Sequence, residues 1–142
     1  MTEALPLVHL ALVAAYGGLQ WTVRVLVYPQ FATVPADAFP EVHARHSRLI
    51  SRLVGPLFAG QAVTTGWLLI APPSGTPWPP VALTAVALAG VLLLTALGAV
   101  PLHRQLGRGF SADVHRRLLR VDTARTAAAT GNVLAAGWLV LG

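Results

Sequence analysis

The chain contains no cysteine and no lysine, and it carries little charge of either sign. Without cysteine it can form neither a disulfide nor a thiolate metal site. Charged residues make up 11% of its 142 residues, whereas a soluble domain has about 25%, and its mean hydropathy is +0.65. These deficits exclude an ordinary soluble domain and indicate an integral membrane protein.

One long stretch lacks charge altogether. Residues 53–102 contain no Asp, Glu, Lys, Arg or His. This is too long for one membrane span of about 20 residues and suits two. The sequence "APPSGTPWPP", residues 71–80, divides them because its prolines and glycine cannot continue a helix.

Two further apolar segments, residues 4–23 and 126–142, flank that pair. The sequence therefore predicts an all-α protein: one domain, residues 1–142, folded as an up-down bundle of four transmembrane helices. The expected helices cover about 5–28, 38–71, 80–105 and 111–141.

The basic residues predict how the bundle is oriented. All ten are arginines, and most lie in the connection between the first two helices and in that between the last two. Since cytoplasmic loops collect Lys and Arg, we expect both connections in the cytoplasm, both termini outside, and a multi-pass location in the cell's inner (plasma) membrane. Trp78 and Trp138 would lie near the outer interface. This topology accounts for the positive charge, so we expect a lipid bilayer and not nucleic acid as partner.

Helical periodicity separates two kinds of side chain on the second helix, within "FPEVHARHSRLI", residues 39–50. His43 and His46 share one face, and the arginines of that region share the other. The last helix divides likewise: His115, Asp122, Arg125 and Asn132 oppose Arg116, Arg117 and Arg120. We interpret the arginine faces as collars at the membrane surface and the histidine faces as directed into the bundle.

In an up-down bundle these inward faces meet at the cytoplasmic end. His43, His46, His103 and Asp122 would then lie at one level, and bundle cores commonly build copper, iron or zinc sites from such ligands. The alternative is that each histidine is an interfacial residue, and that Asp122 forms a structural ion pair with Arg24 or Arg125. Gln61 and Asn132 are expected to be hydrogen-bonding groups that join helices.

Three segments, "LVYPQF", "VPLHRQL" and "VDTARTAAATGNVLAAGWLV", resemble the anthrone oxygenase-like family of small four-helix membrane proteins. That family has Asn early in helix 2, "VPLN" closing helix 3 and "WNxxRT" opening helix 4. His46, His103 and Asp122 stand here in place of the three asparagines, while Arg125 and Thr126 match. The resemblance implies oxygenation of an apolar aromatic substrate such as an anthrone, and the departures favour a metal site.

The resulting expectation is a membrane-embedded oxygenase-like enzyme that depends on copper or non-haem iron and acts on an apolar small molecule. The expected metal ligands are His43, His46, His103 and Asp122. The expected catalytic residues, which would offset negative charge or donate a proton, are Arg125, Arg24 and Tyr28. Whether His115 joins the site is left open.

Two other functions remain open at this stage. One is a non-enzymatic membrane binder of a metal or of haem. The other is a small accessory subunit whose polar core is structural. Small residues within 80–105 permit close helix packing within one chain or between copies, which leaves a homo-oligomer open.

Overall fold

The computed structural model describes residues 4–142, and all regular structure in that part of the chain is helical. Four long helical stretches follow one another. The first comprises α1 (Leu5–Thr22), the π-helix η2 (Val23–Val27), α2 (Tyr28–Gln30) and the 3₁₀ turn η3 (Phe31–Thr33). The second is α3 (Phe39–Ile70). The third comprises α4 (Trp78–Leu93), the π-helix η4 (Leu94–Ala99) and α5 (Val100–Leu106), and the fourth is α6 (Ala112–Leu141).

The four expected helices are therefore present, with one difference in extent. The first was expected to end before Pro29 and instead continues to Thr33. Proline lacks an N–H and its ring clashes with the carbonyl four residues earlier. Here the helix widens to a π-turn just before the proline, where Tyr28 N–H bonds Val23 O. The wider turn lets the helix pass Pro29.

Other boundaries follow from local signals. Ser111 caps α6, as its position before Asp113 predicts, and its hydroxyl accepts from Val114 N–H at 3.5 Å. Between α3 and α4 the chain turns through Gly75, whose φ of +79° is open to glycine and strained for other residues.

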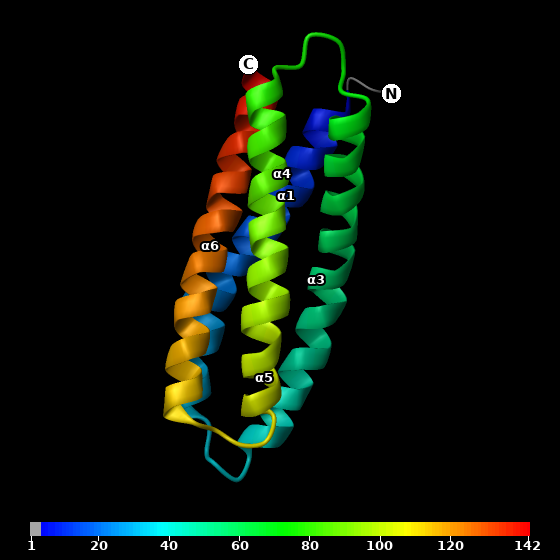
Figure 1. Cartoon of the computed structure of the whole chain (residues 1–142). Coiled ribbons are helices and arrows are strands. Elements are labelled where there is room, and N and C mark those ends of the chain that lie inside the picture. Colours follow the sequence, from blue (N-terminus) through cyan, green and yellow to red (C-terminus); the bar gives the residue numbers. More distant parts are fainter. Residues whose placement is uncertain (1–3) are drawn as a thin grey trace.

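The helices pack around a common axis. α6 contacts α1, α4 and α5, α1 also contacts α3, and α3 contacts α4. Figure 1 shows the ends of the chain and the loop between α3 and α4 at one end of the molecule. The connections from η3 to α3 and from α5 to α6 lie at the opposite end, which we call the basic end because Arg45 of α3, Arg104 of α5, Arg108 of the second connection and Arg116 of α6 lie near it.

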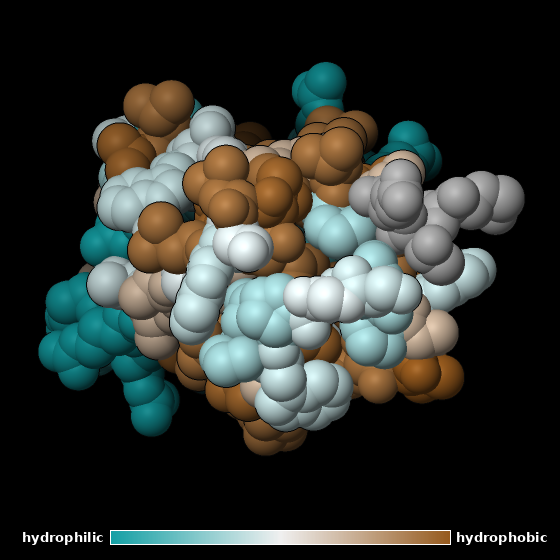
Figure 2. All heavy atoms as spheres, turned by 90° about the horizontal axis from the view of Figure 1, so that it is seen from above, coloured by the Kyte–Doolittle hydropathy of each residue, from teal (hydrophilic) through white to brown (hydrophobic). Residues whose placement is uncertain are grey.

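The distribution of polarity is the reverse of that in a soluble protein. Large apolar side chains face outward, among them Leu26, Val63, Val86 and Leu134, which are 56–70% exposed. Figure 2, viewed from the end with the termini, shows hydrophobic side chains around much of the outer edge. Buried side chains include His9, Gln61, Asp122 and Asn132. A surface this apolar needs a lipid or protein partner.

Three of the four stretches, Leu5–Thr33, Phe39–Ile70 and Trp78–Leu106, are long and apolar enough to cross a membrane. Within the described residues α6 does not join them, because its first half is rich in arginine and its inward face is polar. The structure is thus consistent with membrane association.

Candidate functional site

Buried polar side chains form three clusters inside the bundle. The first lies in the half nearer the termini. His9 is fully buried, and its two ring nitrogens lie 2.8 Å from Thr64 Oγ1 and 2.7 Å from Thr84 Oγ1. Thr84 also donates to Asn132 Oδ1, and Asn132 Nδ2 donates to Gln61 Oε1 at 3.3 Å. These bonds join all four helical stretches, so the interpretation of Gln61 and Asn132 as helix-joining groups is confirmed.

The second cluster surrounds a buried ion pair. Asp122 Oδ1 accepts from Gln20 Nε2 at 2.6 Å and from Arg125 Nη1 at 3.3 Å. Arg125 Nη2 donates to Tyr16 Oη at 3.2 Å, and Tyr16 donates to Gln20 at 3.1 Å. Of the two arginines considered as partners of Asp122, the structure selects Arg125.

Two polar atoms of this pair remain unsatisfied. Asp122 Oδ2 and Arg125 Nε are buried and have no hydrogen-bond partner among the described residues. Buried polar atoms usually find a partner, in the protein or in bound water or ligand. The second cluster therefore retains capacity to bind a further polar group.

The third cluster lies nearer the basic end and contains a chain of three side chains from three helical stretches. Tyr28 Oη lies 2.8 Å from His103 Nε2, and His103 Nδ1 lies 3.0 Å from His43 Nε2. His46 is beside them, its ring stacked on that of His103 at 6.3 Å between centroids. Its Nε2 is buried and has no hydrogen-bond partner within residues 4–142.

Local structure fixes each member of this chain. Tyr28 follows the π-turn η2, and His103 lies in α5 after the π-turn η4. Single π-turns occur often at functional sites. His115 donates from Nε2 to the backbone oxygen of Tyr28 at 2.7 Å, which holds that residue in place. His115 thus supports the third cluster through the backbone of Tyr28.

Aromatic side chains close the third cluster toward the basic end of the bundle. Phe31 contacts both His43 and His46, with centroids 5.6 and 5.1 Å apart. Phe39 stacks on His43 at 5.5 Å and meets Phe110 at 5.2 Å. Because Phe31, Phe39 and Phe110 come from the two connections or their edges, they block axial access to the histidines.

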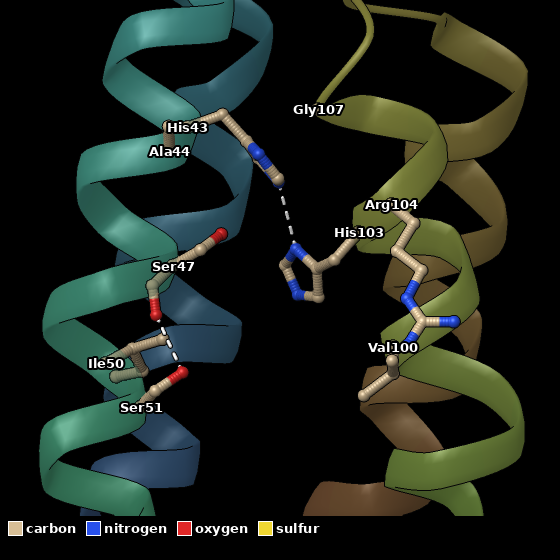
Figure 3. A pocket seen from close by; sticks show the side chains of 9 residues that line it. All are labelled: His43, Ala44, Ser47, Ile50, Ser51, Val100, His103, Arg104 and Gly107. Carbon is tan, nitrogen blue, oxygen red and sulfur yellow. Dashed lines mark hydrogen bonds between the residues drawn. The ribbon is translucent and has the colours of Figure 1, made fainter.

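The cluster opens sideways instead, between α3 and the η4–α5 stretch. An outer cavity of about 350 Å³ includes His43, Ser47, His103 and Arg104. Figure 3 shows His43 projecting from α3 toward His103 on α5 across this space. An inner cavity of about 260 Å³ reaches Tyr28, His103 and Arg125.

The two cavities share Ile50, Ser51, Val100 and His103 and so form one groove, which we call the α3–α5 groove. Its combined space is of the size that small-molecule sites have. Its walls are mainly apolar, while the polar atoms of His43, His103, Tyr28 and Arg125 converge at its inner side. The third cluster and Arg125 are therefore accessible from the same lateral opening.

The structure brings together some of the predicted site residues and separates others. His43, His46, His103 and Tyr28 form the third cluster, and Arg125 reaches the same groove. Asp122 belongs to the second cluster. Arg24 lies on the outer side of η2, where its Nε donates to Thr123 Oγ1 at 2.9 Å, and it lines a different cavity.

The residues fit a metal ion only in part. Two nitrogens bound to one metal at about 2.0–2.1 Å are about 3 Å apart, as are those of His43 and His103. Tyr28 would then orient His103 from behind, as partners of ligand histidines commonly do. However, no three His, Asp or Glu side chains within residues 4–142 come together as a metal site, and the predicted set with His46 and Asp122 is not assembled.

Sequence reasoning missed two features. One is that Gln20 and Tyr16 hydrogen-bond to Asp122 and Arg125. These polar side chains lie in apolar segments, where such residues usually pair with one another, so the pairing could have been expected. The role of His9 was also missed, since its partners Thr64 and Thr84 carry no special signal in a helix.

Comparisons of the chain with protein-family models, with curated proteins and with solved structures return no match.

Proposed function

We propose that this chain is a multi-pass membrane enzyme, an oxygenase-like oxidoreductase, that acts on an apolar and preferably aromatic molecule in the α3–α5 groove. One observation carries the proposal: the hydrogen-bonded chain of Tyr28, His103 and His43 lies at the inner wall of an apolar groove that opens sideways between α3 and α5. A substrate dissolved in lipid would enter there without crossing the aqueous phase.

The membrane placement supports this route. With the basic end in the cytoplasm and both termini outside, as the arginine distribution favours, the groove lies on the cytoplasmic side of the bilayer. Exposed arginines of α3, α5 and α6 then lie at the level of the lipid phosphates. In this placement α6 is the fourth span, its polar face covered by the other helices.

The residues have distinct roles in the proposed reaction. A substrate with an acidic C–H beside a carbonyl would place its oxygen near Arg125, whose charge offsets the negative charge that develops when the proton leaves. His103 lines the inner cavity and can accept that proton, while the hydroxyl of Tyr28 beside it can donate a hydrogen bond. The hydrogen bond between His103 and His43 provides a path along which this proton can move toward the outer cavity.

Molecular oxygen is the co-substrate that balances the reaction. A methylene group and O₂ yield a ketone and water: two C–H bonds break, one oxygen atom enters the product and the other leaves as water. No additional reductant is required. Copper or iron, if it is the resident cofactor, would be held by His43 and His103, with His46 nearby, and would supply activation of O₂.

The test combines metal content with oxygen consumption. The protein is produced with Cu or Fe supplied and purified anaerobically, and metal per chain is measured for wild type, His43→Ala and His103→Ala. His9→Gln, a change in the first cluster, is the matched control. Oxygen uptake is recorded with anthrone as probe. We expect uptake in wild type and the control, and loss in both cluster variants. Wild type without uptake, whatever its metal content, contradicts the enzymatic proposal.

A second candidate is a non-enzymatic membrane metal binder. It is favoured by the nitrogens of His43 and His103, which lie 3.0 Å apart, about the separation of two ligands on one metal ion. It predicts bound metal without oxygen uptake. Haem fits less well, because its axial ligands stand on opposite faces of the ring, whereas these two nitrogens are within hydrogen-bond distance. A Soret band in the visible spectrum would favour haem.

A further inference from the structure

Arg24 and Trp21 lie on the outer surface of the bundle, where the histidine site gives them no role. They line a cavity of about 650 Å³ between the α1–η2 stretch and α6, and Val25, Ala127, Gly131 and Leu134 line it too. Trp21 is 52% exposed although it is large and apolar. We call this cavity the α1–α6 groove.

Both polar side chains of the groove are held in fixed positions. Trp21 Nε1 donates to Thr130 Oγ1 at 3.0 Å, and Arg24 Nε donates to Thr123 Oγ1 at 2.9 Å. The terminal nitrogens of Arg24 have no carboxylate partner among the described residues, where the only ion pairs involve Arg116 and Arg125. The guanidinium is therefore oriented and available to an anion.

The groove has a charged end and an apolar end. From Thr123 to Leu134 the helix rises about 16 Å, close to the thickness of one leaflet in a hydrocarbon core of about 30 Å. Arg24 lies at the end of the groove nearer the basic end of the bundle, and Leu134 lies at the end nearer the termini. Toward the basic end, one and two helical turns before Thr123, the same face of α6 carries Arg120 and Arg116, which are both exposed.

We propose that the α1–α6 groove binds one anionic phospholipid of the cytoplasmic leaflet. An acyl chain lies along Val25, Ala127 and Gly131, and the phosphate contacts Arg24, with Arg120 below it. Charge complementarity supports this occupant, because arginine is the only charged residue that lines the groove. The proposal rests on the membrane placement and is independent of the reaction at the histidines.

Trp21 provides the readout. A chain whose other tryptophans are replaced (Trp67→Phe, Trp78→Phe and Trp138→Phe, all at exposed positions) is reconstituted in phosphatidylcholine vesicles. Brominated phosphatidylglycerol or brominated phosphatidylcholine is added in increasing fraction. We expect half-maximal quenching of Trp21 at an about fivefold lower mole fraction of the anionic lipid, the preference that one arginine at a membrane surface supplies.

The variants separate charge from shape. Arg24→Gln should abolish the preference, whereas Arg24→Lys and Arg45→Gln, a matched loss of charge on exposed α3, should retain it. Gly131→Leu adds a side chain to the groove at a position where a Cβ atom would meet nothing within 4 Å, and it should reduce quenching by both lipids. Gly66→Leu, at an equally open position in α3, is its control.

Two results would overturn the proposal. One is equal quenching by the two lipids in wild type, or a preference that Arg24→Gln leaves intact. The other is a Gly131→Leu variant that lowers the oligomeric mass while the quenching curves stay unchanged, since the groove would then be occupied by a second copy of this chain.

Discussion

At the scale of single residues, α6 contains two ion pairs of the same design in opposite surroundings. Arg116 pairs with Asp113 and Arg125 pairs with Asp122, each three residues apart. The side chains of the first pair are 62% and 81% exposed, and those of the second 7% and 0%. Solvent screens the charges of the exposed Arg116–Asp113 pair. The cost of removing the Arg125–Asp122 charges from water is offset only by their attraction and by their hydrogen bonds.

We therefore expect Asp122→Asn to destabilise the protein far more than Asp113→Asn. Asparagine keeps the shape and can still accept from Gln20, but it leaves the Arg125 charge buried without a counter-charge, which costs about 3–5 kcal/mol. Loss of the exposed pair costs about 1 kcal/mol or less. Thermal unfolding of both variants in the same detergent measures the difference, and equal shifts would show that the Asp122 pair contributes no more than a surface pair.

At the scale of helices, two stretches widen at corresponding places. The π-helix η2 directly precedes Tyr28 and Pro29, and η4 directly precedes Val100 and Pro101. In both, the residue before the proline bonds to the carbonyl five residues back. The widening relieves the proline clash and changes the rotation of the helix beyond it. Tyr28 and His103, which meet in the third cluster, both follow such a turn.

The position of η4 against α6 depends on a glycine. A Cβ atom added at Gly98 would lie 2.8 Å from Val121 Cγ1, closer than any real contact, whereas one at Gly90 in the preceding α4 would meet nothing within 4 Å. Gly98 is therefore the point where η4 can approach α6 closely.

We expect Gly98→Ala to destabilise the bundle by about 1–3 kcal/mol through overpacking. Gly90→Ala should be neutral or slightly stabilising, because alanine is the better helix former. Unfolding of the two variants by a denaturing detergent, followed by circular dichroism, compares them in one helical stretch. A Gly98→Ala protein as stable as Gly90→Ala would mean that Val121 turns away at little cost.

At the scale of the whole molecule, the bundle holds polar groups inside and apolar groups outside. This arrangement is favourable where lipid or a protein partner covers the outer faces of the helices. α6 is the element that depends most on the others, because its inward face bears Asp122, Arg125 and Asn132 and its sequence is the least apolar of the four.

The absence of cysteine makes the topology directly testable. Ser74→Cys lies in the loop between α3 and α4, Arg108→Cys in the connection before α6, and Gly142→Cys at the end of the chain. We expect a membrane-impermeant maleimide to label positions 74 and 142 in intact cells, and position 108 only after permeabilisation. Labelling of position 142 together with 108 would show that α6 does not cross the membrane.

Much of the fold could be predicted from the sequence. Long uncharged segments, prolines between them and the clustering of arginine determined four helices and their approximate limits. Periodicity also placed His43 and His46 opposite the exposed arginines of α3, and the capping serine ahead of Asp113 indicated that α6 begins near Ser111. These features depend on residues near one another in the chain, so composition and spacing are sufficient to specify them.

Only the tertiary structure decided which buried groups meet. Sequence spacing put His46, His103 and Asp122 at one level, but the packing of α6 between α1 and α4 assigns Asp122 to Gln20 and Arg125, and leaves His103 to Tyr28 and His43. It also turns Arg24 outward, away from the site. Such pairings depend on helix rotation and on π-turns that shift it by a fraction of a turn, and neither is determined by a periodicity of 100° per residue.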